Sequence, residues 1–286
     1  MNHLKIFIEL TRLNKPIGFM LLFWPCSWGL AYANYFKQNT STLIYYLILF
    51  FVGSVLMRSA GCIFNDIVDR DYDKKVERTK NRPITSGQIS VKRSLIYVLI
   101  LCLLAFFVLI QFNLPTILFG MSSMIFAFSY PFMKRITYWP QLFLGLTFNW
   151  GIIMAWTAMG NEVSFNIIIL YISAIFWTLG YDTIYGTQDM SDDEIIGLKS
   201  TSIKFKKNIK LFLFVSYLIT SLLMIYLFIE LLEINFSLFF LISFIITLFY
   251  QIFKFNENKP EDCLRMFKLN NLSGFFLFLS LITINI

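Results

Sequence analysis

The stretch Asn65-Asp66-Ile67-Val68-Asp69-Arg70-Asp71-Tyr72-Asp73 follows directly on a long apolar run, 43–64. It places four carboxylates and an amide side by side at the end of that run. Carboxylates at the boundary of an apolar segment are costly unless a cation uses them. A second acidic cluster, Asp189-Met190-Ser191-Asp192-Asp193, follows another apolar run, 164–186. Two such clusters on one chain indicate a pair of divalent metal ions that hold a diphosphate.

The composition is typical of a membrane protein. Of the 286 residues, 57% are hydrophobic and only 14% are charged, and the mean hydropathy is +0.67. Apolar runs of about 20 residues are long enough to cross a bilayer as helices. Pro115 breaks the long run 94–132 because proline disrupts a helix interior. We therefore predict an all-α polytopic membrane protein with spans at 16–36, 43–64, 94–112, 115–132, 140–159, 164–186, 209–230, 236–253 and 269–286.

Basic residues set the predicted orientation of these spans. All of the 24 lysines and arginines except Lys37 and Arg58 lie in the N-terminal segment or in the connections after every second span. Because positively charged connections stay in the cytoplasm, the N-terminus and both acidic clusters are predicted to be cytoplasmic. The net charge of +7 then reflects topology, and we expect no nucleic-acid partner.

Few residues other than carboxylates can bind a metal. The chain has one histidine, His3, and its four cysteines lack the spacing of a metal site. This excludes a His-ligated zinc site and a Ser-His-Asp triad. Oxygen ligands remain, and they favour Mg²⁺ as the cofactor.

The first acidic cluster has helical spacing. If the helix of the second span continues past Asn65, then Asn65, Asp69 and Asp73 lie on one face at i, i+4 and i+8. Magnesium usually takes one or two carboxylates and completes its shell with phosphate oxygens and water. The spacing therefore predicts side chains that project into a pocket.

A second helical stripe comes from Asp182, Asp189 and Asp193, at i, i+7 and i+11. Two stripes that face each other across a cavity would meet the needs of two metal ions. Asp71 and Asp192 fall outside both stripes, and for them a solvated surface position is an equal alternative.

At these residues the chain resembles the UbiA superfamily of intramembrane aromatic prenyltransferases. The first motif of that family, NDxxDxxxD, reads here as Asn65-Asp66…Asp69…Asp73, and the second reads as Asp189…Asp193. Other segments resemble its 4-hydroxybenzoate polyprenyltransferase branch, and together the motifs extend from about residue 12 to 206. These segments are Arg12–Gly18, Trp24-Pro25, Arg58–Cys62, Arg78–Pro83, Tyr130–Arg135, Gly180–Tyr185 and Gly197–Thr201.

The resemblance implies a single domain over 1–286, with nine transmembrane helices around a central cavity. Two cytoplasmic cap loops, about 66–93 and 189–208, would cover Mg²⁺ and the diphosphate, and a lateral opening would admit the lipid tail. The implied reaction transfers a polyprenyl group from a polyprenyl diphosphate to 4-hydroxybenzoate, ortho to its hydroxyl, in ubiquinone biosynthesis. The implied location is a bacterial inner membrane, or the mitochondrial inner membrane in a eukaryote.

The site residues expected on this basis fall into three groups. The metal ligands are Asn65, Asp66, Asp69, Asp73, Asp189 and Asp193. The substrate-binding residues are Arg58, Arg78, Arg82, Tyr130, Lys134, Arg135, Tyr185 and Lys199. The catalytic residues are Asp69, Asp189, Asp182 and Arg135, with Asp182 as a base or a ring-orienting acid.

Some roles stay open from the sequence. Arg135 and Arg58 each suit either the acceptor carboxylate or the diphosphate, and Lys134 and Arg135 also suit a role as a membrane-surface anchor. The acceptor itself has alternatives: homogentisate, a naphthoate or the haem vinyl group. An ion-coupled transporter is a further alternative, but it predicts acids near the centres of spans, whereas these acids lie at cytoplasmic ends.

Overall fold

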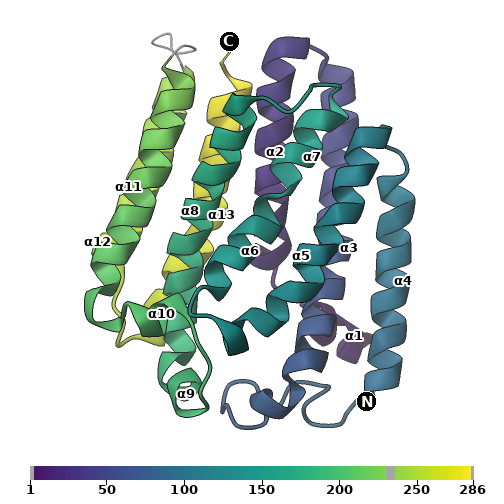
Figure 1. Cartoon of the computed structure of the whole chain (residues 1–286), viewed down its shortest axis with the longest axis vertical. Helices are drawn as coiled ribbons and strands as arrows, with labels where there is room; N and C mark the ends of the chain where they lie inside the picture. The colour runs from purple at the N-terminus through teal and green to yellow at the C-terminus, as the bar shows by residue number, and fades with distance from the viewer. Residues whose placement is uncertain (1–2, 230–235, 285–286) are drawn as a thin grey trace.

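The computed structural model describes residues 3–229 and 236–284, and every regular element within them is helical (Figure 1). The long helices are α2 (Ile17–Lys37), α3 (Thr40–Asp73), α4 (Val91–Leu109), α5 (Leu114–Ile136), α8 (Phe165–Gly186), α11 (Ile209–Phe228), α12 (Phe236–Lys254) and α13 (Pro260–Ile282). The short ones are α1 (His3–Thr11), α6 (Pro140–Asn149), α7 (Gly151–Ala158), η1 (Thr187–Asp189), α9 (Met190–Ile195), α10 (Thr201–Lys204) and η2 (Lys206–Asn208). The all-α prediction is confirmed.

Within the part of the chain that the structure describes, six helical runs are long and apolar enough to cross a membrane. They are Thr40–Asp73, Val91–Leu109, Leu114–Ile136, Phe165–Ile195, Lys206–Phe228 and Phe236–Lys254. The helices α2 and α13 and the short pair α6 and α7 also fall on predicted spans but are not among the six. The count of nine spans and the cytoplasmic N-terminus therefore stay predictions.

The predicted break in the run 94–132 is present, and local capping explains it. The side chain of Asn113 accepts a hydrogen bond from the backbone N–H of Thr116 at 3.1 Å, which begins α5. Pro115 lies in the first turn, where its missing N–H leaves no hydrogen bond unmade. The apolar run is thereby divided between α4 and α5.

The observed helices depart from the predicted boundaries in three places. The helix α3 continues without interruption to Asp73, so the first part of the predicted cap loop 66–93 is helical and irregular chain begins after it. The predicted span 140–159 is divided into α6 and α7 near Trp150. The helix α13 begins at Pro260, well before the predicted start at 269, because its first two turns are polar and carry no hydropathy signal.

The helix α1 had no counterpart in the sequence prediction. Its residues Ile6 and Leu10, one helical turn apart, are buried against Ala60 and Ile63 of α3. This packing fixes the start of the chain beside the acidic end of α3.

Aromatic residues and a buried polar network hold α2, α8, α12 and α13 together. The rings of Trp28 and Trp177 lie 4.8 Å apart, between α2 and α8. Trp177 Nε1 donates to Oδ1 of Asn270 at 2.8 Å, and Asn270 Nδ2 donates to Oε1 of Gln251 at 2.9 Å. Buried amides satisfied in this way fix the register of α8, α12 and α13.

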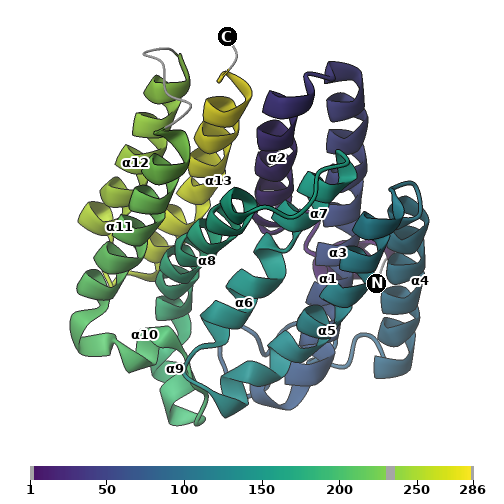
Figure 2. The same cartoon turned by 45° about the horizontal axis from the view of Figure 1, so that its top comes forward.

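The polar connections gather at one end of the molecule. Figure 1 shows the connection 74–90, α9 and α10 at the same end as α1, opposite the C-terminus. In both views α6 lies between α5 and α8 (Figure 2). This arrangement brings the acidic end of α3 and the segment after α8 to the same end of the bundle.

Candidate functional site

A cavity of about 1220 Å³ occupies the interior of the bundle. Side chains from α2 to α8 and from α13 line it, together with the connections that follow α3 and α8. Its end near the connection 74–90 carries the charged residues, and the remainder, toward α4, α5 and α7, is mostly apolar. A large apolar chamber with charged groups at one end suits an amphiphilic ligand.

The first acidic stripe faces this cavity as predicted. Asn65, Asp69 and Asp73 all line it, and Asn65 Nδ2 donates to Oδ2 of Asp69 at 3.0 Å. Asp66 points elsewhere: it is buried and is not among the described residues that line the cavity. Its Oδ1 instead accepts from Arg12 Nη2 at 2.6 Å.

The second acidic cluster reaches the cavity by a different path from the one predicted. Asp182, Asp189 and Asp193 all line the cavity. However, α8 ends at Gly186, and a single 3-10 turn separates it from α9. The three carboxylates therefore belong to three successive elements rather than to one continuous helical face.

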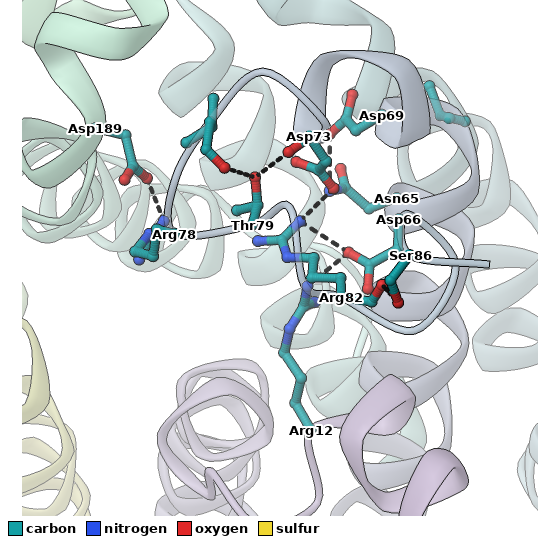
Figure 3. Close-up of polar contacts among 12 residues, drawn as sticks. Arg12, Asn65, Asp66, Asp69, Asp73, Arg78, Thr79, Arg82, Ser86 and Asp189 are labelled. Carbon is teal, nitrogen blue, oxygen red and sulfur yellow. Dashed lines mark hydrogen bonds and ion pairs between the residues drawn. The ribbon is translucent and has the colours of Figure 1, made fainter. Parts of the chain in front are cut away.

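Basic side chains neutralise several of these carboxylates, and Figure 3 shows the ion pairs of Asp66, Asp73 and Asp189. Asp69 is held by Lys134 Nζ at 2.5 Å and by Arg135 Nη2 at 3.3 Å. Arg82 Nη1 lies 2.7 Å from Oδ2 of Asp73 and 3.0 Å from Oδ1 of Asp66. Such pairing compensates for the removal of the charges from water.

Across the cavity, Arg78 forms an ion pair with Asp189, and its Nη1 donates to the hydroxyl of Tyr185 at 3.2 Å. Burial disfavours the charged form of Arg78, but Tyr185 and Asp189 outweigh it and raise the pKa of Arg78. Burial likewise opposes the charge on Arg12, and Asp66 outweighs it, so the pKa of Arg12 is also raised. Both guanidinium groups remain charged at any physiological pH.

In this arrangement the carboxylates do not converge on one point. Within residues 3–229 and 236–284, no three histidine, cysteine or acidic side chains are grouped closely enough to bind a metal unaided. The donor set is nevertheless one of hard oxygen ligands, arranged around a cavity that could admit phosphate oxygens.

The expected substrate-binding residues lie around the same charged end. Tyr130 and Lys134, one helical turn apart on α5, both line the cavity, as do Tyr185 and Lys199. Lys199 Nζ donates to the carbonyl oxygen of Ile136 at 3.2 Å, which holds the second connection against α5.

Arg135 differs from these residues. It is absent from the described cavity lining, and its guanidinium lies over the ring of Tyr72 at 4.8 Å from the ring centre. Its Nη2 also donates to the carbonyl oxygen of Val68 at 2.8 Å. Arg135 thus contacts Asp69 and α3, whereas Lys134 contacts both Asp69 and the cavity.

Arg58 lies deeper in the cavity, two helical turns before Asn65 on the same helix. Its Nε is buried and has no hydrogen-bond partner among the described residues, and its guanidinium lies 5.4 Å from the ring centre of Phe148. Asp182 is within its electrostatic reach. A buried guanidinium nitrogen without a partner is costly, so this is a position for an anionic group that the protein does not itself provide.

Sequence reasoning did not assign Arg12 to the site, although it lines the cavity and neutralises Asp66. Arg12 has a left-handed backbone with φ 54°, which turns the chain between α1 and α2. The sequence offers one signal for it, the segment Arg12–Gly18 that resembles the family, but nothing in the sequence pairs Arg12 with Asp66, 54 residues away.

The apolar part of the cavity opens sideways between α4 and α5. Four side chains both line the cavity and are exposed on the outer surface: Leu99, Leu103, Phe106 and Met121. We call this opening the α4–α5 gap. It faces the surface that a surrounding bilayer would cover, and these four side chains are all apolar.

Comparison with known proteins identifies the family. The model of the UbiA prenyltransferase family matches residues 22–280. The mitochondrial 4-hydroxybenzoate polyprenyltransferases of Bos taurus and Homo sapiens are 41% and 40% identical to the chain over 291 aligned residues, which cover 99% of this chain and 76% of each relative.

Solved structures share the fold. The apo structure of a UbiA homolog from Aeropyrum pernix K1 has a TM-score of 0.78 at 18% identity and covers 93% of this chain and 98% of its own. A UbiA homolog from Archaeoglobus fulgidus bound to GPP and Mg²⁺ has a TM-score of 0.70 at 19% identity, with 98% and 100% covered. The two acidic motifs around one cavity, the fold and the family match agree, and this chain belongs to the UbiA prenyltransferase family.

Proposed function

We propose that this protein transfers a polyprenyl group from a polyprenyl diphosphate to the ring of 4-hydroxybenzoate, ortho to the hydroxyl, in ubiquinone biosynthesis. The observation that carries the proposal is the similarity over nearly the full chain to 4-hydroxybenzoate polyprenyltransferases. The cavity supports it independently, because it combines a charged end with a long apolar chamber that opens sideways.

The charged end fits a diphosphate bound with Mg²⁺. Asn65, Asp69 and Asp73 on one side and Asp189 and Asp193 on the other would hold the metal, together with phosphate oxygens. Divalent cations supply Lewis-acid neutralisation of a departing diphosphate. Asp66 does not line the cavity. It would hold Arg12 and Arg82 in position through its ion pairs with them.

The basic side chains would act on the same leaving group. Lys134, Arg78 and Arg82 are paired with carboxylates now, and each lines the cavity. With those carboxylates bound to a cation, the ammonium and guanidinium groups would be free to donate to phosphate oxygens. Such donors stabilise the negative charge that grows as the allylic C–O bond breaks. Tyr185 and Lys199 complete this ring of donors.

Arg58 is the proposed site for the acceptor carboxylate. Its unpartnered Nε lies in the cavity beyond the diphosphate end, and the adjacent Phe148 offers a ring face to an aromatic acid. Asp182 and Tyr130 line the same region. There Asp182 would orient the phenol hydroxyl or accept the proton that leaves the ring carbon after attack on the allylic cation.

Arg135 is proposed as a positioning residue rather than a substrate ligand. It contacts Asp69 and the backbone of α3 and would keep that carboxylate aimed into the cavity. A dry chamber is needed because water would quench the allylic cation, and the apolar lining of α4 and α5 supplies it.

We further propose a single domain of nine spans, with a cytoplasmic N-terminus and cytoplasmic caps at 74–93 and 189–208. Six runs of the described residues have the length and hydropathy of a span, and the polar connections gather at one end of the bundle. The location would be a bacterial inner membrane or, as for the relatives of mitochondrial name, the mitochondrial inner membrane.

The test is direct. The purified chain in lipid vesicles is incubated with Mg²⁺, octaprenyl diphosphate and ring-labelled 4-hydroxybenzoate, and a lipid-soluble labelled product is identified by mass spectrometry. Homogentisate and a hydroxynaphthoate are offered in parallel. Product from either of these, with none from 4-hydroxybenzoate, would overturn the acceptor assignment while leaving prenyl transfer intact.

A further inference from the structure

We propose that the aromatic acid enters the cavity through an opening of its own, separate from the α4–α5 gap. The inference rests on the proposed function and adds the route of the acceptor. The opening, which we call the basic mouth, is formed by Asn14 and Lys15 before α2 and by Lys268 and Asn271 on α13. All four residues are exposed, and all four line the cavity, so the cavity reaches the surface between them.

The two lysines of the basic mouth are free to attract an anion. Neither Lys15 nor Lys268 forms an ion pair with any residue that the structure describes. Arg12, three residues before Lys15, is by contrast held by Asp66. Unpaired cations at the rim of a low-dielectric cleft raise the local concentration of anionic substrates.

The basic mouth opens directly beside the proposed carboxylate site. The backbone N–H of Gly18 donates to the carbonyl oxygen of Lys15 at 3.3 Å, so the two residues share one turn. A Cβ atom added at Gly18 would lie 2.8 Å from Arg58 Nε. The absence of a side chain at Gly18 therefore leaves room for Arg58 within one helical turn of Lys15, so the path from the mouth to Arg58 is short.

The α4–α5 gap offers an anion no comparable path. Leu99, Leu103, Phe106 and Met121 form its exposed lining, and none of them can donate a hydrogen bond to a carboxylate. A benzoate anion that entered there would lose its hydration with no compensation. The gap instead fits the polyprenyl chain, whose head group lies at the charged end of the same cavity.

The first half of the test removes the charge of the mouth. Lys15→Gln combined with Lys268→Gln, in vesicles, is expected to raise KM for 4-hydroxybenzoate roughly tenfold, because electrostatic focusing of this kind is worth at least that factor. The kcat and the KM for octaprenyl diphosphate are expected to stay unchanged. Added salt should raise the wild-type KM for the acid and have little effect on that of the variant.

Lys207→Gln combined with Lys210→Gln is the matched control. These two lysines are also exposed and unpaired among the described residues, but they do not line the cavity. The control removes the same charge from the protein and is expected to leave both KM values as they are.

The second half of the test narrows the α4–α5 gap. Leu103→Trp, which adds bulk to the lining, is expected to lower kcat/KM for octaprenyl diphosphate about tenfold relative to geranyl diphosphate, with no change in KM for the acid. Leu104→Trp is its control, since Leu104 is exposed on the same helix but is not in the described lining.

The outcomes separate the two proposals. A wild-type chain that forms no prenylated product overturns the proposed function itself. An active wild type whose KM for the acid is unmoved by the double lysine variant overturns the basic mouth. A variant that raises KM for both substrates alike indicates one shared entrance and also overturns it.

Discussion

The ammonium of Lys134 lies 2.5 Å from Oδ2 of Asp69 and thereby joins α5 to α3 at the charged end of the cavity. Asp69 is only 1% exposed, so its charge needs a partner in every state of the protein. In the proposed reaction Asp69 would serve as a ligand of Mg²⁺, and Lys134 would then be free to donate to the diphosphate. This one ion pair would thus hold in place both a metal ligand, Asp69, and a diphosphate donor, Lys134.

Replacement of Asp69 by asparagine should abolish this arrangement. Asp69→Asn keeps the size of the side chain and an oxygen that can accept from Lys134, so folding and membrane insertion are expected to be retained. Prenyl transfer is expected to fall at least about 100-fold, the effect of removing one group that stabilises charge in a transition state. Initial rates at saturating Mg²⁺ measure the effect.

Asp71→Asn is the matched control, because Asp71 lies on the same helix but is exposed and pairs only with Arg70 and Lys74 among the described residues. It is expected to leave the rate unchanged. Near-normal turnover of Asp69→Asn at saturating Mg²⁺ would contradict the assignment of Asp69 as a metal ligand.

Removal of divalent metal should stop the reaction reversibly. Because the proposed metal ligands are carboxylate and amide oxygens, EDTA is expected to abolish product formation and excess Mg²⁺ to restore it. Binding of a labelled diphosphate to the vesicles should weaken in parallel, which separates binding from turnover. Full activity after exhaustive chelation would rule out the metal-assisted reaction.

Local spacing allowed part of the site to be predicted. Asn65, Asp69 and Asp73 face the cavity because α3 continues unbroken through them, as the i, i+4, i+8 pattern requires. Tyr130 and Lys134 share a face of α5 for the same reason. Within one helix, the interval between two residues determines how their side chains point relative to each other. Sequence spacing was therefore enough to place these side chains on one face.

Contacts between distant segments could not be predicted in this way. Helical spacing turns Asp66 away from the stripe of Asn65, but it does not show that Arg12 pairs with it, and the turn that carries Arg12 depends on one left-handed residue. The break after Gly186 likewise has no proline to announce it. The openings of the cavity depend on how α2, α4, α5 and α13 pack, which hydropathy does not encode.

The two arginines Arg58 and Arg135 should respond differently to substitution. Arg58→Gln is expected to raise KM for 4-hydroxybenzoate with little change in KM for the diphosphate, because removing one partner of a buried charge pair costs about 2–5 kcal/mol. Arg135→Gln is expected to lower kcat instead, since it releases Asp69, which acts as the leaving group departs. Steady-state kinetics with each substrate varied in turn measure both effects. A raised KM for 4-hydroxybenzoate in Arg135→Gln, with a lowered kcat in Arg58→Gln, would indicate that Arg135 binds the acceptor carboxylate.

Packing between α8 and α11 provides a test of the fold that does not depend on activity. A Cβ atom at Gly180 would collide with the ring of Tyr217, which is fully buried and donates to Oε1 of Gln251 at 2.8 Å. Because that ring cannot retreat, Gly180→Ala is expected to destabilise the protein by about 1–3 kcal/mol. Gly61→Ala is the matched control: apart from its chain neighbours and the backbone of its own helix, no atom of the described residues lies within 4 Å of its added Cβ, and alanine favours the helix. Thermal unfolding in detergent should show a lower Tm for Gly180→Ala alone, and equal Tm values for the two variants would contradict this close approach of α8 and α11.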